Sequence, residues 1–353
     1  MQLTFRWYGE SDPVTLGEIR QIPGMKGIVS ALHDRSAGEV WPLEDIVRYK
    51  RHVESFGLQL SVIESIPVHE AIKMGLPSRD EYLDHYRETL RNLAQAGVST
   101  VCYNFMPLFD WLRTAVDVRL PDGSTTMAYN ESEVDEAALL TGKLRLPAWN
   151  ITEQHEELNA MYAYYRTMPA EQLWRNLNDF IQAVMPVARE CGVNMAIHPD
   201  DPPWPVLGLP RIIGDQQGLE RLTQLYDDPC NGICFCSGSL GANPENRLTA
   251  IVRHFGSRKR IHFVHLRNVK VTRYRSFYES GHLSQEGSVD MYSVVKALHD
   301  VSFAGPVRPD HGRMIWGETG NPGYGLYDRA LGAAYVHGLW EAVSKGGEGE
   351  RYG

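Results

Sequence analysis

The sequence has no long apolar run, which bears on where the protein works. No stretch approaches the roughly 18 consecutive apolar residues that a membrane-spanning helix needs. The first residues, MQLTFRWYGESDP, also lack the basic-then-apolar layout of a secretory signal peptide. We therefore expect a cytoplasmic protein with no membrane partner.

Basic runs are also missing. Lys and Arg number 35 against 44 Asp and Glu, which gives a formal net charge of -9, and the basic residues do not cluster along the chain. Binding to DNA or RNA relies on a concentrated basic surface. The composition therefore argues against a nucleic-acid partner.

Cysteines are few, and they lie at positions 102, 191, 230, 234 and 236. An odd number of cysteines without a secretory signal favours free thiols in a reducing compartment. The last three cluster, but their spacing is not the CxxC pairing of a zinc ribbon, so a structural zinc knuckle is disfavoured.

The chain does contain a regular alternation of apolar runs and helical stretches. Eight short runs occur: LTFRWY (3–8), GIVSAL (27–32), LQLSVIES (58–65), STVCYNFM (99–106), VNMAIH (193–198), GICFCS (232–237), RIHFVHL (260–266) and PVRPDH (306–311). Short, nearly continuous apolar runs are typical of buried parallel strands. Apolar residues at helical spacing mark intervening helices at 79–96, 173–191, 219–225 and 291–298.

This alternation predicts the α/β class and a (β/α)8 TIM barrel. An open doubly wound sheet is the alternative, but no GxGxxG follows the first run. We predict a single catalytic domain over residues 1–345 and a flexible tail over 346–353. We also predict a long insertion after the fourth strand, at 110–160 over the barrel mouth, and an extended loop at 271–290 after the seventh strand.

Metal-binding residue types stand at the ends of the last four predicted strands. They are His198, Cys236, His265 and Asp310. Barrel active sites lie at the carboxyl ends of the strands, so these side chains should converge on one divalent metal ion. Two imidazoles, a thiolate and a carboxylate suit zinc or iron, whereas open positions for a substrate would favour manganese. A single strand histidine or cysteine is more often a core residue, as we expect for His262 and Cys234, so the prediction depends on the four together.

Six further residues are candidates for chemistry or binding. His311 and Tyr324 could transfer protons; Arg267 and Asn268 could bind a carboxylate and a hydroxyl; Trp7 and Tyr8 could line the pocket. A structural ion pair is the alternative for Arg267, and barrel packing is the alternative for the two aromatic residues.

Several long motifs together resemble one family, the bacterial mannonate dehydratases. They are FRWYGESDPVTLGEIRQIPG, YNFMPLFDW, HPDDPPWP, FCSGSLGANPEN, HLRNV, GHLSQEGSVDM, RPDHGR and PGYGLYDRALG. The resemblance runs from residue 3 to about 342. It implies a metal-dependent, xylose-isomerase-like TIM barrel, a hydro-lyase that converts D-mannonate to 2-keto-3-deoxy-D-gluconate in hexuronate (glucuronate) breakdown.

The resemblance also implies roles for particular residues. It makes His198, Cys236, His265 and Asp310 the metal ligands and His311 with Tyr324 the acid/base pair. It implies manganese as the usual metal, with iron, cobalt or zinc as alternatives, and a homodimer or higher homo-oligomer. One departure is Arg247, where an acidic residue is expected; it bears on surface or subunit contacts and leaves the chemistry untouched.

Two other functions stay open at this point. A metal-dependent sugar or sugar-acid isomerase would use the same barrel, although such enzymes usually bind their metal without a thiolate such as Cys236. A non-catalytic sugar-acid binding protein would be expected to have lost a ligand or a proton-transfer group, and this sequence retains them all.

Overall fold

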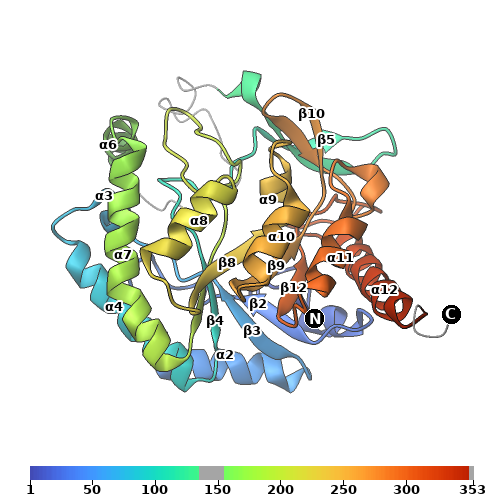
Figure 1. The fold of residues 1–353 in the computed structure, drawn as a ribbon, viewed down its shortest axis with the longest axis horizontal. Helices are drawn as coiled ribbons and strands as arrows, with labels where there is room; N and C mark the ends of the chain where they lie inside the picture. Colours follow the sequence, from blue (N-terminus) through green and yellow to red (C-terminus); the bar gives the residue numbers. More distant parts are fainter. Residues whose placement is uncertain (135–154, 350–353) are drawn as a thin grey trace.

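In the computed structural model, which describes residues 1–134 and 155–349, eight parallel strands close into a barrel (Figure 1). Their order around the barrel is β1-β12-β9-β8-β7-β4-β3-β2. The bounds are β1 Gln2–Arg6, β2 Gly27–Ser30, β3 Gln59–Glu64, β4 Thr100–Tyr103, β7 Asn194–Ile197, β8 Asn231–Cys236, β9 Ile261–Leu266 and β12 Pro306–Pro309. The TIM barrel is confirmed, and each strand falls within one residue of its predicted apolar run.

Helices surround this barrel, as Figure 1 shows. They are α1 Leu16–Gln21, α2 Leu43–Ser55, α3 Glu70–Met74, α4 Arg79–Gln95, α6 His155–Arg166, α7 Ala170–Cys191, α8 Gln216–Leu225, α9 Ser237–Gly241, α10 Leu248–Gly256, α11 Met291–Asp300 and α12 Tyr327–Gly349. The predicted apolar stripe lies on α7, where Leu177, Phe180 and Ile181 are fully buried. This helix ends at Gly192, whose φ of +69° is the left-handed conformation that favours glycine.

A small apolar layer fills the barrel interior. It consists of Val29, Val62, Cys102, Ala196, Cys234 and Phe263, each from a different strand. Inward-pointing side chains of the strands fill a barrel of this kind, so its interior is a packed core. Cys234 belongs to this core, as predicted, and Cys236 lies two residues farther along the same strand.

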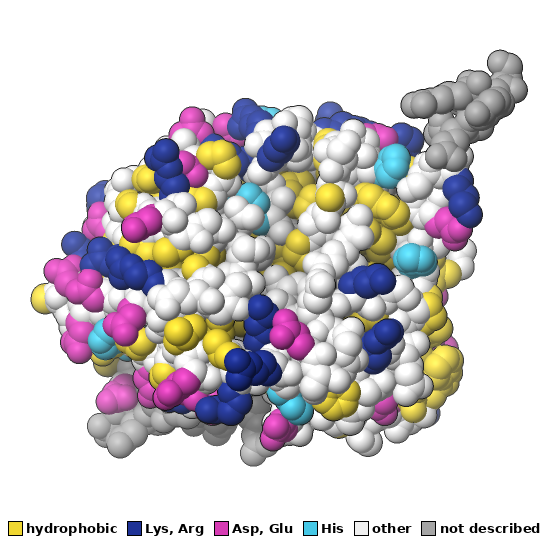
Figure 2. Space-filling view, turned by 90° about the horizontal axis from the view of Figure 1, so that it is seen from below, with side chains coloured by type: hydrophobic (Ala, Val, Ile, Leu, Met, Phe, Trp, Pro, Cys, Tyr) yellow, Lys and Arg dark blue, Asp and Glu magenta, His cyan; other side chains and the backbone are white. Residues whose placement is uncertain are grey.

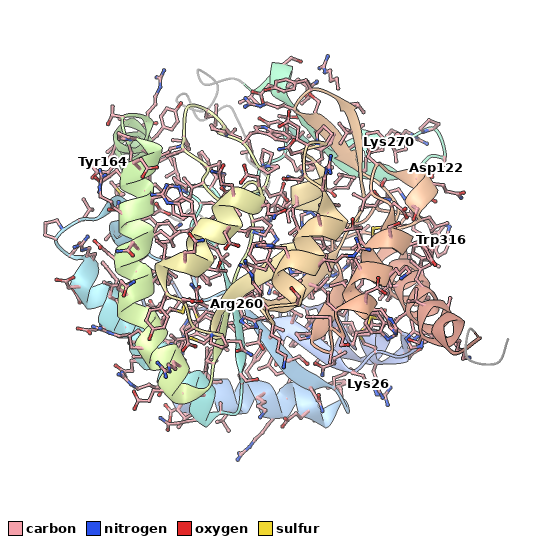
Figure 3. All side chains as sticks on the ribbon, in the orientation of Figure 1. Lys26, Asp122, Tyr164, Arg260, Lys270 and Trp316 are labelled. Atoms are coloured by element: carbon pink, nitrogen blue, oxygen red, sulfur yellow. The ribbon has the colours of Figure 1, made fainter. Side chains whose placement is uncertain are left out.

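A second, antiparallel sheet is built from two segments far apart in the chain. Its order is β10 (Val269–Arg273), β11 (Ser276–Glu279), β6 (Thr125–Asn130) and β5 (Ala115–Arg119). Figure 3 shows Lys270 of β10 at the opposite end of the molecule from Lys26, which precedes β2. The sheet therefore lies at the carboxyl end of the barrel, and its strands include residues 271–273 and 276–279 of the segment predicted as a loop at 271–290.

The structure describes only parts of the predicted insertion and tail. Residues 135–154 of the insertion and residues 350–353 lie outside the described residues. Helix α12 continues through Gly349, so it extends into the segment predicted as a tail. The domain boundaries stay a prediction.

The helices and the surface also bear on partners. In the part of the chain that the structure describes, every helix is too short or too polar to cross a membrane. Figure 2 shows one face of the molecule, on which side chains of both charge signs are interspersed.

Candidate active site

The four predicted metal ligands meet at the carboxyl ends of their strands. His198 Nε2 lies 3.1 Å from His265 Nδ1, which lies 3.6 Å from Asp310 Oδ2. The same carboxylate oxygen is 3.9 Å from Cys236 Sγ. Strand register explains the meeting: Cys236 pairs with His265, and Pro309, which precedes Asp310, pairs with Leu266.

The three separations, 3.1, 3.6 and 3.9 Å, lie on either side of and within the range expected around one bound ion. A tetrahedral ion with bonds of roughly 2.0 to 2.3 Å holds neighbouring donor atoms roughly 3.3 to 3.8 Å apart. The side chains of Cys236, His265 and Asp310 are buried, so their charges and lone pairs need partners. Cys236, His265 and Asp310 form one group with the spacing of metal ligands, and His198 with His265 belongs to a second group that includes Cys234. The donor types therefore suit a divalent transition metal, and one ion held by all four predicted ligands stays a prediction.

Cys236, and not Cys234, has the environment of a thiolate ligand. Both sulfur atoms lie near His265. The Cys236 sulfur accepts hydrogen bonds from Ser239 N at 3.4 Å and Ser239 Oγ at 3.2 Å. Burial alone would raise the pKa of the Cys236 thiol, but Arg267 and the two histidines bring it well below its usual range. Burial instead raises the pKa of Cys234, which stays a thiol in the core.

The predicted acid/base pair lies beside this cluster. His311 Nε2 and Tyr324 Oη are 2.5 Å apart, and both side chains are buried. His311 follows the predicted ligand Asp310, and its ring contacts the Trp111 ring edge-on at 5.2 Å. Burial raises the pKa of Tyr324 well above its usual range, so its phenol stays protonated at neutral pH.

A buried network of charges supports the site, and most of its members could not be predicted from the sequence. Arg113 binds both oxygens of Asp201, at 2.9 and 3.0 Å, and its Nη2 lies 2.6 Å from Glu279 Oε1. Arg267 bridges the same two carboxylates, at 2.7 Å and 3.1 Å, and its Nη1 lies 3.5 Å from Asp310 Oδ2. The ion-pair interpretation of Arg267 therefore matches its contacts.

The other predicted substrate contacts separate into two groups. The Tyr8 ring meets the Tyr324 ring edge-on at 5.0 Å, so Tyr8 lies at the site. The Trp7 ring instead stacks on Tyr49 and His52, within the core. Asn268 is buried; it donates to Leu283 O at 2.8 Å and accepts from Val289 N at 3.0 Å, so it holds a loop in place. The structure does not bring Trp7 to the cluster, and the amide of Asn268 is engaged elsewhere.

Glu64 and Arg308 are further site residues that sequence reasoning missed. Glu64 ends β3, and its Oε1 lies 3.2 Å from His265 Nε2. Arg308 Nη1 lies 2.7 Å from Asp310 Oδ1. The signal that could have found them is their position, because each stands at the carboxyl end of a barrel strand.

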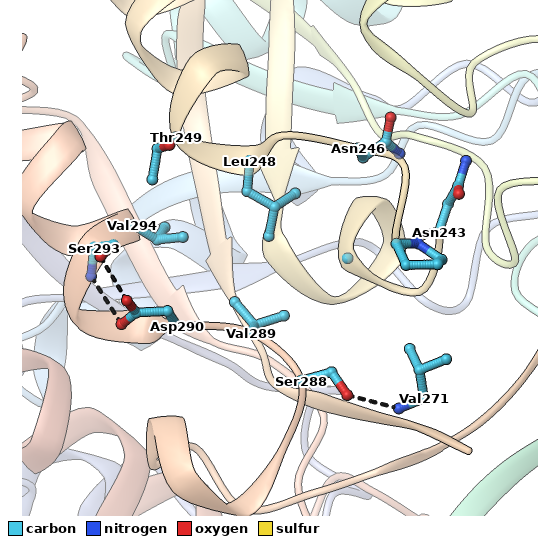
Figure 4. A pocket seen from close by; sticks show the side chains of 12 residues that line it. Asn243, Asn246, Leu248, Thr249, Val271, Ser288, Val289, Asp290, Ser293 and Val294 are labelled. Carbon is cyan, nitrogen blue, oxygen red and sulfur yellow. Dashed lines mark hydrogen bonds between the residues drawn. The ribbon is translucent and has the colours of Figure 1, made fainter. Parts of the chain in front are cut away.

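A surface pocket of about 330 Å³ lies elsewhere, between the segment around α10 and the start of α11 (Figure 4). Two of its polar side chains already have partners: Asp290 accepts from Ser293, and Ser288 accepts from the backbone of Val271. None of the predicted site residues lines it. The candidate active site is therefore the ligand cluster at the barrel mouth.

Comparisons with known proteins agree with this site. The profile of the D-mannonate dehydratase (UxuA) family matches residues 1–349. Mannonate dehydratase 2 of Halalkalibacterium halodurans is 57% identical over 344 residues, which cover 98% of this chain and 100% of that protein.

Two solved structures extend the comparison. The crystal structure of mannonate dehydratase from Streptococcus suis serotype 2 superposes with a TM-score of 0.91 at 49% identity, over 98% of this chain and 96% of the other. A xylose isomerase domain protein from Planctomyces limnophilus has a TM-score of 0.57 at 11% identity, over 97% of this chain and 98% of the other, and shares the fold alone. By its whole-length match and high identity, this chain belongs to the D-mannonate dehydratase (UxuA) family.

Proposed function

We propose that this chain is a metal-dependent hydro-lyase that converts D-mannonate to 2-keto-3-deoxy-D-gluconate in hexuronate breakdown. The observation that carries the proposal is the cluster of His198, Cys236, His265 and Asp310, next to the hydrogen-bonded pair of His311 and Tyr324. Family membership supports the same reaction.

The ligand residues would hold one divalent ion. When bound, such an ion supplies Lewis acidity that stabilises negative charge on substrate oxygen atoms. We propose manganese as the ion, on the family resemblance, with iron, cobalt and zinc as alternatives that the donor set also accepts.

The buried pair would move the two protons of the reaction. The C2 proton of mannonate is weakly acidic, because its removal places negative charge next to the carboxylate. One member of the pair takes this proton, and the other protonates the C3 hydroxyl as it leaves as water. General acid and base steps of this kind each contribute about 10² to 10⁴-fold in rate.

Two of the predicted substrate contacts keep support. Tyr8 lies against Tyr324 and can contact a substrate held there. Arg267 carries a positive charge at the ligand cluster, although three carboxylates already neutralise it. We propose Tyr8 as a direct contact and Arg267 as an electrostatic support for the ligands.

The test is a metal-dependence assay. The protein is treated with a chelator, restored with Mn²⁺ and given D-mannonate while formation of a 2-keto-3-deoxy acid is followed. Product that depends on the ion supports the proposal. Exchange of the C2 proton with solvent without loss of water would instead support a sugar-acid isomerase, and tight D-mannonate binding without any turnover would support a binding protein.

Assembly and location remain part of the proposal. We propose a homodimer or higher homo-oligomer in the cytoplasm, on the family resemblance. Size-exclusion chromatography with light scattering tests the assembly.

A further inference from the structure

The two histidines of the cluster turn opposite ring nitrogens toward the other donors. His198 faces the cluster with Nε2, and its Nδ1 lies 2.7 Å from Pro199 O. His265 faces the cluster with Nδ1, and its Nε2 lies 3.2 Å from Glu64 Oε1. A carbonyl and a carboxylate can only accept, so these contacts favour the tautomers with the proton on the outer nitrogen and a lone pair on the inner nitrogen.

The partner of His265 differs in kind from the partner of His198. Pro199 O is backbone next to its own histidine, so that contact is local. Glu64 comes from β3, far from His265 in the sequence, and only the closed barrel brings the two together. A charged acceptor on a metal-bound histidine also increases the basicity of the ring.

A single arginine holds Glu64 in place and ties it to a second ligand. Arg308 Nε lies 3.2 Å from Glu64 Oε2, and its Nη2 donates to Glu64 Oε1 at 3.3 Å. The same guanidinium reaches Asp310 Oδ1 at 2.7 Å, while Asp310 Oδ2 faces the cluster. Its planar fork therefore fixes a carboxylate ligand and the carboxylate behind a histidine ligand together.

We propose that Glu64 is a positioning residue of the metal site: it sets the tautomer and orientation of His265 so that Nδ1 is the ligating nitrogen. The inference rests on the proposed metal site but not on the identity of the substrate. Loss of an outer partner of this type costs about 10- to 100-fold in metal affinity.

The test measures Mn²⁺ affinity of the chelator-treated protein, with free Mn²⁺ followed by electron paramagnetic resonance. The variant is Glu64→Gln, which keeps the shape and removes the charge. The matched control is Glu70→Gln: Glu70 is 19% exposed against 16% for Glu64, and it also pairs with a cation, Lys73 at 2.6 Å, but it contacts no ligand.

We expect the Kd for Mn²⁺ to rise about 10- to 100-fold in Glu64→Gln and to stay unchanged in Glu70→Gln. An unchanged Kd in Glu64→Gln, or an equal loss in both variants, would overturn the inference. If Glu64→Gln does not fold, Glu64→Asp replaces it, since its shorter carboxylate keeps the charge but loses contact with His265; an unchanged Kd there overturns the inference too. The wild-type assay with D-mannonate is separate. A loss of Mn²⁺ affinity in Glu64→Gln, together with no turnover of D-mannonate by the wild type, would contradict the proposed substrate but support the role of Glu64.

Discussion

At the scale of single residues, the shared hydrogen bond between His311 and Tyr324 concentrates the proposed chemistry in one pair. We expect Tyr324→Phe to lower kcat by about 10² to 10⁴-fold, because the phenol O–H is the only group removed. Mn²⁺ content should not change, since Tyr324 donates no metal ligand. Steady-state kinetics with metal analysis checks this, and full turnover would remove Tyr324 from the mechanism.

The acid and base roles of His311 and Tyr324 can be assigned by following the C2 proton. A variant that still exchanges this proton with D₂O but forms no product has lost the acid, whereas a variant that loses exchange has lost the base. Comparison of Tyr324→Phe with His311→Gln by NMR therefore separates the roles. Equal exchange and turnover in both variants would contradict the pair as a whole.

How much of the site the sequence could predict depends on where each residue stands. The sequence predicts His198, Cys236 and Asp310 as site residues because each stands at the end of an apolar run, and parallel barrel strands bring such ends together. The sequence does not predict Arg113 and Glu279 as site residues, because both stand in segments without a clear apolar period and meet only through the folded outer sheet. Glu64 ends a strand, but a glutamate at a strand end is also an ordinary solvated residue.

At the scale of elements, helix α9 depends on a glycine behind the ligand Cys236. A Cβ on Gly238 would lie 2.0 Å from Arg267 Nε, and that guanidinium is held by buried carboxylates. We expect Gly238→Ala to destabilise the protein by about 1 to 3 kcal/mol through overpacking. Urea unfolding measures this.

The control for that prediction is a glycine in an uncrowded helix. Gly338 of α12 is exposed, and a Cβ there would meet nothing within 4 Å. Gly338→Ala should therefore raise stability by about 0.5 to 1 kcal/mol, because alanine loses less conformational freedom in a helix. Losses of similar size in both variants would contradict the role assigned to Gly238.

Buried charges join the outer sheet to the barrel, in addition to the apolar packing of Tyr129 and Phe277 in the core. Glu279, on β11, pairs with Arg113 from the insertion and Arg267 from the end of β9. Glu279→Gln should cost about 3 to 5 kcal/mol of stability, because it removes one carboxylate partner from each of two buried guanidinium groups. The exposed pair of Arg221 and Glu171, with the same kind of contact at 2.7 Å, is the control, and Glu171→Gln should leave stability unchanged. A stability loss too small to measure in Glu279→Gln would show that the network does not join the sheet to the barrel.

The strands of this sheet show the limit of prediction from patterns. The barrel strands could be predicted because each is a nearly continuous apolar run flanked by a helix. Strands β10 and β11 are mixed in polarity, with Lys270 and Thr272 beside Val269 and Val271. Their pairing also crosses from β11 to β6, more than a hundred residues away, which no local period reveals.

At the scale of the whole molecule, metal binding should be coupled to stability. The four predicted ligands lie on or directly after four neighbouring strands, β7, β8, β9 and β12, so an ion that binds them would stabilise the closed barrel. Saturation at 100 times the Kd should add about 2.7 kcal/mol to the free energy of unfolding. Calorimetry before and after chelation tests this, and an unchanged Tm would mean that the ion does not bind the native fold in preference to the unfolded chain.

The most direct test of the metal site is the absorption spectrum of the Co²⁺-loaded protein. A thiolate bound to Co²⁺ gives a sulfur-to-metal charge-transfer band in the near ultraviolet. We predict this band in the wild type and in Cys234→Ala, and its loss in Cys236→Ser. A band that survives in Cys236→Ser and disappears in Cys234→Ala, or a wild type without any such band, would contradict the four-ligand site on which the account depends.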